Sequence, residues 1–234
     1  MLRLDGVRAG YKGRPVIFGV DFQLANGESL ALLGRNGVGK TTLLRTVIGA
    51  LPLAQGSLSL DGTSIALLKP HARARLGIAY VPQGREVFAG LTVLDNLKVP
   101  AVALFGRNWR PHIEKILDEF SVLAQRLHSA AESLSGGQQQ ILALARALIL
   151  DPRILILDEP SEGIQPSILD EIAGIIRREK SQRGLSLLVA EQNLEFAAAL
   201  SDRAAVMERG RITALLSTRE LEQSNELQRR YLAV

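Results

Sequence analysis

GRNGVGKT, residues 34–41, has the G-x-x-x-x-G-K-[ST] spacing of a loop that joins a strand to a helix. An apolar run at residues 30–33 precedes it, and apolar side chains at helical spacing follow it up to Ile48. In such a loop the backbone N–H groups and the helix N-terminus point at a polyphosphate, and Lys40 would reach the β- and γ-phosphates. A glycine-rich turn that only starts a helix is the plainer alternative. The flanking strand and helix favour a phosphate-binding loop.

Residues 154–157, ILIL, are too short for a helix and too apolar for an edge strand, so they predict a strand buried on both faces of a parallel sheet. Ligands of open α/β sheets lie beyond the carboxyl ends of the strands. Asp158 is then placed to hold Mg²⁺ together with Thr41, and Glu159 to orient or deprotonate the attacking water. A buried strand followed by an acidic helix cap would produce the same letters.

Residues 134–138, LSGGQ, stand between these two motifs and begin a predicted amphipathic helix that continues through residues 139–150. Ser135 supplies a hydroxyl group, and Gly136 and Gly137 leave backbone amides unobstructed, so this surface suits an anion. A helix cap would explain Ser135 but not the paired glycines. We therefore interpret the segment as a second surface that faces a phosphate group.

The composition favours one compact domain. The chain has 234 residues, of which 47% are apolar and 4% aromatic, so it can bury one sizeable core but offers few rings on which bases could stack. Cysteine is absent, which excludes disulfides and thiolate metal sites. We find no apolar run of membrane-spanning length and no signal-peptide core. A net charge of +4 without Lys/Arg blocks does not favour nucleic-acid binding.

The remaining patterns predict alternating strands and helices, which is typical of an α/β core with a mainly parallel sheet. Tyr11 is expected in the turn between two antiparallel strands, residues 2–7 and 16–24. Pro100 and Pro111 are expected to interrupt the helical patterns that precede the LSGGQ segment. The other predicted elements are strands at residues 56–60, 78–81 and 185–189, a helix that begins at Pro166, and short helices at residues 218–221 and 226–232.

The three motifs, in this order, make the chain resemble the nucleotide-binding subunit of ATP-binding cassette (ABC) transporters. The resemblance covers nearly the whole chain. It implies a P-loop core with a mainly parallel sheet, an N-terminal antiparallel β subdomain and an inserted helical subdomain at residues 84–134. It further implies a single domain over residues 1–234 and a Mg²⁺-dependent ATPase, with ATP and Mg²⁺ as its cofactors.

The resemblance also assigns roles to single residues. Glu159, Gln83 and Gln192 are the expected catalytic residues. Thr41, Gln83 and Asp158 are the expected Mg²⁺ ligands, and Gln83 also begins the segment expected to lean on a membrane subunit. The residues expected to bind ATP, the first by stacking on adenine, are Tyr11, Gly34, Arg35, Asn36, Gly37, Val38, Gly39, Lys40, Thr41 and Thr42. Those expected to cap the γ-phosphate held by a second subunit are Ser135, Gly136, Gly137 and Gln138.

The chain departs from the pattern of this family at two places. Gln165 stands where the loop after the two carboxylates usually has an aspartate, and Gln192 stands where a switch histidine usually follows the strand at residues 185–189. No histidine follows His128. An amide can hydrogen-bond a γ-phosphate but cannot carry a positive charge or shuttle a proton. Hydrolysis is therefore expected to depend on the general base, the loop lysine and Mg²⁺.

These departures narrow the resemblance to the ATPases of importers for branched-chain amino acids, urea and short-chain amides. The segments that carry it are EQN at residues 191–193 and VPQGREVF at residues 81–88. Three segments are more similar to the urea branch, namely GRNGVGK at residues 34–40, EGIQPSI at residues 162–168 and YLAV at residues 231–234. The resemblance thus implies a urea or short-chain amide importer. A branched-chain amino acid importer, an export ATPase and a soluble ABC protein are the alternatives.

Partners and location follow from the same resemblance. The expected partners are permease subunits in the membrane, a second ATPase subunit or a second copy of this chain, and, indirectly, a periplasmic binding protein. Nucleic acid is not expected. The chain is expected in the cytoplasm, bound peripherally to the inner face of the cell membrane. Residues 85–88 are expected either to grip a helix of a partner or to form a simple surface loop.

Overall fold

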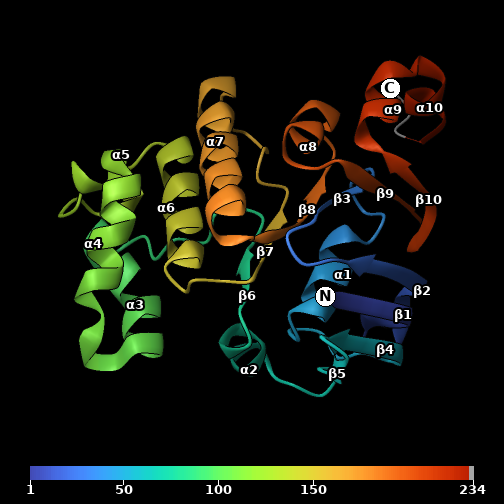
Figure 1. The fold of residues 1–234 in the computed structure, drawn as a ribbon, viewed down its shortest axis with the longest axis horizontal. Coiled ribbons are helices and arrows are strands. Elements are labelled where there is room, and N and C mark those ends of the chain that lie inside the picture. Colours follow the sequence, from blue (N-terminus) through green and yellow to red (C-terminus); the bar gives the residue numbers. More distant parts are fainter. Residues whose placement is uncertain (232–234) are drawn as a thin grey trace.

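The computed structural model describes residues 1–231 and contains two β-sheets (Figure 1). The antiparallel sheet has the order β2-β1-β4-β5, with β1 Leu2–Tyr11, β2 Arg14–Leu24, β4 Gln55–Leu60 and β5 Thr63–Ser64. The six-stranded sheet has the order β10-β9-β3-β8-β7-β6 and is parallel except at β10. Its strands are β3 Ser29–Leu33, β6 Ile78–Val81, β7 Ile154–Asp158, β8 Ser186–Glu191, β9 Arg203–Glu208 and β10 Arg211–Ser217. The predicted fold class is confirmed.

The helices are unevenly distributed around these sheets. Helices α3 to α6 gather at one end of the molecule, far from the antiparallel sheet, and α7 lies between them and the strands of the core (Figure 1). The helices are α1 Lys40–Val47, α2 Pro70–Arg75, α3 Val93–Phe105, α4 Arg110–Glu119, α5 Ser121–Ala124, α6 Gly136–Leu148, α7 Pro166–Arg183, α8 Leu194–Leu200, α9 Thr218–Gln223 and α10 Asn225–Tyr231. No helix among residues 1–231 is both long enough and apolar enough to cross a membrane.

The six-stranded sheet separates two hydrophobic clusters. Side chains of a strand alternate between the faces of its sheet. In β3, Ala31 and Leu33 accordingly belong to the cluster shared with the helices α3 to α8, whereas Leu30 and Leu32 belong to the cluster shared with α1 and the antiparallel sheet. All four side chains are buried. Burial on both faces explains why the central strands are continuous apolar runs in the sequence.

The expected position of Tyr11 is wrong. Tyr11 is the last residue of β1 and pairs with Arg14, so it lies in the sheet and not in the turn. The turn consists of Lys12 and Gly13, both with positive φ, of 48° and 79°. A two-residue hairpin turn of this kind needs positive φ at both positions because its twist must match that of the strands.

The expected interruption at Pro100 is also wrong, because α3 continues through it to Phe105. A proline removes one backbone hydrogen bond from a helix interior. Here the buried side chains of Val93, Leu97 and Ala101 lie on both sides of Pro100, and α3 packs on α6. This packing compensates for the lost bond. Pro111, in contrast, begins a helix as expected, since it lies in the first turn of α4.

Several elements were not predicted from the sequence, namely α2, α8, β9 and β10. The predicted helix at residues 226–232 corresponds to α10, which the structure describes up to Tyr231. Residues 232–234, the remainder of the YLAV ending, lie outside the described residues.

Arg73 of α2 anchors the carboxyl end of α1. Its side chain is buried and bonds only to backbone carbonyl groups in the described structure. It donates to Thr46 O at 2.8 Å and Val47 O at 2.6 Å, in the last turn of α1, and to Ala66 O and Leu68 O, each at 2.9 Å. Thr46 O also accepts a hydrogen bond from Gly49 N at 3.2 Å, so the arginine adds a side-chain cap to the carboxyl end of α1.

Candidate functional site

Residues 34–41 form the loop between β3 and α1, and they border a cavity of about 270 Å³. The loop fits tightly against β9. A side chain at Gly34 would place its Cβ atom 2.5 Å from Met207 O, and Gly39 has a φ of 112°, which side chains rarely adopt. The residues that line the cavity are Val16, Arg35, Asn36, Gly37, Gly39, Lys40, Thr41, Thr42, Gln83 and Glu159.

Lys40 is buried at the floor of this loop, with its side chain 3% exposed. Its ammonium group donates to Gly34 O at 2.5 Å and to Arg35 O at 3.1 Å, and it forms an ion pair with Glu159 Oε1 at 3.0 Å. A buried ammonium and a buried carboxylate each need a partner of opposite charge. The pair therefore fixes the carboxyl group of Glu159 at the edge of the cavity.

Asp158, the last residue of β7, lies beside the loop. It accepts hydrogen bonds from Thr41 Oγ1 at 3.0 Å and from the hydroxyl group of Tyr80 at 2.9 Å. Burial raises the pKa of Asp158, while the bonds from Tyr80 and Thr41 oppose that shift. The structure thus brings two of the three predicted Mg²⁺ ligands, Thr41 and Asp158, into direct contact.

Tyr80 was not identified from the sequence. It is the one polar-tipped side chain in the short apolar strand β6, and a partly buried tyrosine hydroxyl needs a hydrogen-bond partner. That need was the available signal. The hydroxyl group holds one oxygen of Asp158 and leaves the other to Thr41.

Glu159 has a strained backbone. Its φ of 49° is uncommon for a residue with a side chain, and its N–H group donates to Ala190 O of β8 at 2.9 Å. Gln83 Nε2 donates to Glu159 Oε2 at 3.2 Å and to Glu162 Oε2 at 2.9 Å. The carboxyl group of Glu159 is therefore fixed between Lys40 and Gln83, as expected for a group that must be aimed.

Gln192, the first residue after β8, reaches the same site through Asn36. In the amide orientation that satisfies both neighbours, Asn36 donates to Glu159 Oε1 at 2.9 Å and accepts from Gln192 Nε2 at 3.0 Å. The structure thus connects Gln192 with the loop and with Glu159. The predicted catalytic residues Gln83, Glu159 and Gln192 lie together.

Glu191 organises the segments on either side of it and was not assigned a role from the sequence. It is buried, and it accepts hydrogen bonds from Ser161 N and Ser161 Oγ, both at 2.9 Å. It also accepts from the backbone of Gln192 at 3.0 Å and Asn193 at 3.2 Å. Burial raises the pKa of Glu191, and these donors oppose the shift. An acidic residue at the end of a buried strand was the signal for such a role.

The signature segment, residues 134–138, does not line this cavity. Ser135 is the N-cap of α6 and forms a capping box with Gln138. A Cβ atom at Gly136 would lie 2.6 Å from the guanidinium of Arg85, and one at Gly137 would lie 2.9 Å from Ile168. The paired glycines, which capping leaves unexplained, are thus needed for close packing.

Two further residues that the sequence singled out lie outside this group of side chains. Tyr11 is 41% exposed, and Val16, not Tyr11, is among the residues that line the cavity. A hydrogen bond to Tyr11 raises the pKa of Arg45. Gln165 is the N-cap residue of α7, with no hydrogen bond from its side chain to the helix. The structure therefore does not bring Tyr11 into the group formed by the loop, Asp158 and Glu159.

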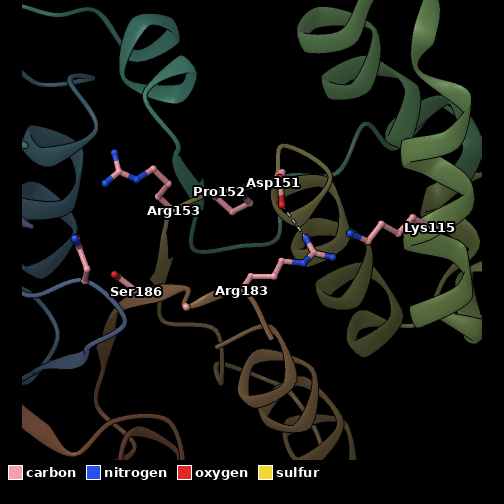
Figure 2. A pocket seen from close by; sticks show the side chains of 8 residues that line it. Lys115, Asp151, Pro152, Arg153, Arg183 and Ser186 are labelled. Atoms are coloured by element: carbon pink, nitrogen blue, oxygen red, sulfur yellow. Dashed lines mark hydrogen bonds and ion pairs between the residues drawn. The ribbon is translucent and has the colours of Figure 1, made fainter. Parts of the chain in front are cut away.

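A larger cavity, of about 510 Å³, lies at the opposite edge of the six-stranded sheet (Figure 2). It is bordered by residues that precede β7 and β8, such as Asp151 and Gly184, and by Lys115 of α4. Arg183 donates to Asp151 at 3.0 Å, and Arg153 donates to Asp61 at 2.6 Å. Both arginines are thus bonded to carboxylates, so the positive charge that they bring to this cavity is already matched.

Comparison with known proteins gives the family. The sequence model of the family described as "ABC transporter" matches residues 17–162. The probable branched-chain amino acid transport ATP-binding protein LivF of Archaeoglobus fulgidus is 38% identical over 212 residues, covering 91% of this chain and 90% of LivF. The high-affinity branched-chain amino acid transport ATP-binding protein BraG of Pseudomonas aeruginosa is also 38% identical over 212 residues, covering 91% of each chain.

Other matches extend over the whole chain. The lipopolysaccharide export system ATP-binding protein LptB of Escherichia coli K12 is 35% identical over 234 residues, covering 99% of this chain and 96% of LptB. A crystal structure of a nucleotide-free ATP-binding cassette from an ABC transporter is 24% identical, covers 97% of this chain and 96% of that chain, and has a TM-score of 0.86. That likeness concerns the fold. Together, the family match and these relatives show that this chain belongs to the ABC transporter family and is one of its ATP-binding cassette ATPases.

Proposed function

We propose that this chain is the ATP-hydrolysing subunit of an importer for branched-chain amino acids. The observation that carries the proposal is the 38% identity with LivF and BraG, over about nine-tenths of all three chains. The sequence resemblance placed urea and short-chain amides first. Neither relative is named for urea, so the branched-chain amino acids take first place, and urea becomes an outcome of the test.

In the proposed mechanism, the phosphates of ATP and Glu159 compete for Lys40. The ammonium now bonds to Glu159 and to two carbonyl groups of the loop. A polyphosphate at the helix N-terminus offers more negative charge than one carboxylate, so it draws Lys40 toward the β- and γ-phosphates. Glu159 then loses its ion-pair partner, and its carboxylate is free to accept a hydrogen bond or a proton from the attacking water.

The residues present fit a Mg²⁺ ion. Mg²⁺ prefers oxygen ligands and is commonly held by one or two carboxylates together with substrate phosphates. Asp158 and Thr41 offer such oxygens in contact with each other, and no cluster of three acidic, histidine or cysteine side chains that could hold a metal exists within residues 1–231. Asp158, Thr41 and Gln83 would hold the ion, which supplies charge neutralisation to the phosphates.

Two amides position the reacting groups. Gln83 donates a hydrogen bond to the carboxyl group of Glu159, so it orients the base. It also links the base to the segment that follows Gln83 in the chain. Gln192 is linked to Glu159 through Asn36 and can donate its amide hydrogen atoms to a γ-phosphate. Since Gln192 cannot take up a proton, its contribution is orientation.

The signature segment is proposed to act on the nucleotide of a partner subunit. It lies outside the cavity of its own chain, yet it presents the N-terminus of α6, where Ser135 and the following amides suit an anion. A head-to-tail dimer would bring it onto the γ-phosphate held by the partner. The second subunit is either a related ATPase or another copy of this chain.

The remaining proposals concern organisation. Residues 84–134 form a helical subdomain inserted in a single domain of residues 1–234, and residues 83–88 transmit motion to a permease. The chain binds peripherally to the cytoplasmic face of the membrane, and a periplasmic binding protein delivers the substrate. Tyr11 is still proposed to stack on adenine, although Val16, and not Tyr11, lines the cavity in this structure.

An export ATPase is the second candidate. The match with LptB over nearly the full length of both chains favours it. An importer and an exporter would contain different permeases bound to this cassette. The identity of the membrane proteins that copurify with it therefore separates the two functions.

The function is tested by transport. Cells that lack the gene are expected to lose uptake of labelled leucine at low external concentration, and the parent chain is expected to restore it. The Glu159→Gln variant, expressed at the same level, should not restore it. Lost uptake of urea with normal leucine uptake would move the assignment to the urea branch. Normal uptake of both, with a defect in an exported surface lipid, would replace the importer by the exporter.

A further inference from the structure

We propose that Arg85 is a positioning residue, whose guanidinium ties residues 84–88 to both the signature segment and the loop at residues 161–165. The inference rests on the proposed function, because only in a dimer would the signature segment act on the nucleotide of the partner. It gives residue 85 a task distinct from that of Gln83, which aims the catalytic base.

The backbone around Arg85 is held in an unusual shape. Gly84, Arg85 and Glu86 have consecutive positive φ angles of 82°, 72° and 44°. Two of these residues carry side chains, for which such angles are unfavourable, and strain of this kind persists only where the surroundings enforce it. The fold therefore holds this backbone in one conformation. That conformation sets the direction in which the side chain of Arg85 leaves the chain.

Arg146 of α6 is part of what enforces this shape. It donates to Glu86 O at 2.8 Å, and its guanidinium lies 4.3 Å from the centre of the Phe88 ring. Burial lowers the pKa of Arg146. Because α6 begins with the signature segment, Arg146 already fastens residues 86–88 to the helix whose first turn is to be positioned.

The guanidinium of Arg85 fills the space beside Gly136. A Cβ atom there would lie 2.6 to 2.9 Å from three atoms of the guanidinium, whereas the next residue, Gly137, packs on Ile168 of α7. The first turn of α6 is thus enclosed between Arg85 and α7. A side chain at position 136 would have to displace the guanidinium of Arg85 from this place.

The same guanidinium reaches the loop at residues 161–165. Its Nη2 atom donates to Gly163 O at 3.4 Å, a long bond, and Gln83 donates to Glu162 of the same loop at 2.9 Å. Residues 83 and 85 therefore hold this loop at two neighbouring points. One planar side chain spans two loops, which a lysine could not do in the same way.

Stabilisation of α6 alone does not explain the contact. The N-terminus of a helix carries a partial positive charge, so a cation beside it is electrostatically unfavourable. Ser135 and Gln138 already cap the helix. The contact has a purpose if the signature segment moves together with residues 84–88. A permease that presses on residues 84–88 would then turn the signature segment toward or away from the nucleotide of the partner.

The test uses the full-length chain with Glu159→Gln, in which ATP should hold the dimer together. Adding Arg85→Ala is expected to raise the ATP concentration needed for half-maximal dimer formation at least fivefold. ATP binding to the monomer and the melting temperature should stay as in the single variant, since Arg85 does not line the cavity. Arg85→Lys should behave like Arg85→Ala. As a control, Arg126→Ala should leave dimer formation unchanged, because Arg126 is exposed and lies in the turn after α5.

Hydrogen exchange in the Arg85→Ala monomer provides a second measurement. The amides of residues 136–138 and 162–164 should exchange at least fivefold faster than in the parent, and those of α1 at the parent rate. Unchanged exchange in both segments, unchanged dimer formation, or full rescue by Arg85→Lys would each overturn the proposal. If the Glu159→Gln chain forms no dimer with ATP, the second subunit is not another copy of this chain, and hydrogen exchange alone decides the role of Arg85.

Discussion

The carboxyl edge and the amino edge of the six-stranded sheet carry cavities that differ in size and in chemistry. The smaller one, of about 270 Å³, contains the Lys40–Glu159 pair and a strained backbone. The larger one, of about 510 Å³, is bordered by arginines whose charges are already matched by carboxylates (Figure 2). The volume of a cavity does not indicate which of the two is the active site. Groups that can exchange one bonding partner for another, such as Lys40 and Glu159, do indicate it. Substitutions at the carboxyl edge should therefore alter turnover, and those at the amino edge should alter stability.

Glu159→Gln should have the largest effect. Losing a general base lowers a rate by roughly 100- to 10,000-fold, so ATP turnover should fall by that factor. ATP binding should persist, because glutamine preserves the shape of the site and Lys40 remains. Steady-state ATPase rates and equilibrium binding of ATP measure the two effects. Lys40→Ala is the complement and should lose ATP binding. Hydrolysis at the parent rate by Glu159→Gln would mean that another group is the base.

Arg183→Ala tests the amino edge. Arg183 bonds to Glu119 at 3.3 Å, Asp151 at 3.0 Å and Glu179 at 3.1 Å, and Glu179 is almost fully buried. Its loss removes the ion-pair partner of that buried carboxyl group and leaves Lys115 as the nearby cation, so the free energy of unfolding at pH 8 should fall by about 1–3 kcal/mol.

Urea denaturation measures this loss of stability. The ATP turnover of the variant should stay within about twofold of that of the parent, which is a small change in activation free energy. Arg153→Ala is the matched control, since that arginine borders the same cavity but is 55% exposed, and it should cost below about 1 kcal/mol. A loss of turnover in Arg183→Ala comparable with that of Glu159→Gln would remove the division between the two edges.

Gln192→Ala should have an intermediate effect at the carboxyl edge. The amide orients the γ-phosphate and, through Asn36, the base, so its removal should lower turnover by about tenfold, or about 1.4 kcal/mol of barrier. Gln192→His should be tolerated. The ATPase rates of the two variants decide this point. A loss in Gln192→Ala as complete as that in Glu159→Gln would show that the amide does more than position.

Glu179→Gln should have the smallest effect, which should develop as the pH rises from about 4.5 through about 7. Burial raises the pKa of Glu179 from 4.5 to about 7, a shift that Arg183 opposes and the neighbouring carboxyl group of Glu119 reinforces. The folded chain thus favours the protonated form. The stability that this contributes is complete below about pH 4.5 and is lost as the pH rises through about 7.

Glutamine cannot ionise, so the variant should gain stability relative to the parent between pH 5 and pH 8, by about 1 kcal/mol. Melting temperatures of both chains over that range measure the gain. The difference between the two chains should be flat with pH if Glu179 is already ionised at pH 5, and that result would remove it as the titrating group.

The parts of the molecule that local sequence determines were predicted well. Residues 34–41, the buried strand before Asp158 and the helix that begins at Pro166 all lie where their patterns indicate. In each, the local requirement and the tertiary environment agree, because glycine, proline and two-sided burial leave few alternatives. The fold class follows from these segments.

The rest depends on contacts between distant segments. Pro100 lies within a helix because α3 packs on α6, which outweighs the local preference. The contact of Arg85 with Gly136 joins residues about fifty positions apart in the sequence, and no periodicity announces it. Strands β9 and β10 are mixed in character. The place of β9 is set by its pairing with β3, and that of β10 by its pairing with β9. Such contacts become visible only in the folded chain.

The buried guanidinium of Arg73 has an electrostatic consequence at the other end of α1. That helix has eight residues and is about 12 Å long. The positive charge of Arg73 cancels the negative pole of the helix, so an anion approaching the loop experiences a field closer to that of a single charge, which decays more slowly than that of a dipole. At an effective dielectric constant of about 20, the added attraction is about 1.4 kcal/mol per phosphate charge. The affinity of the loop for ATP is thus partly set by an arginine that never touches the nucleotide.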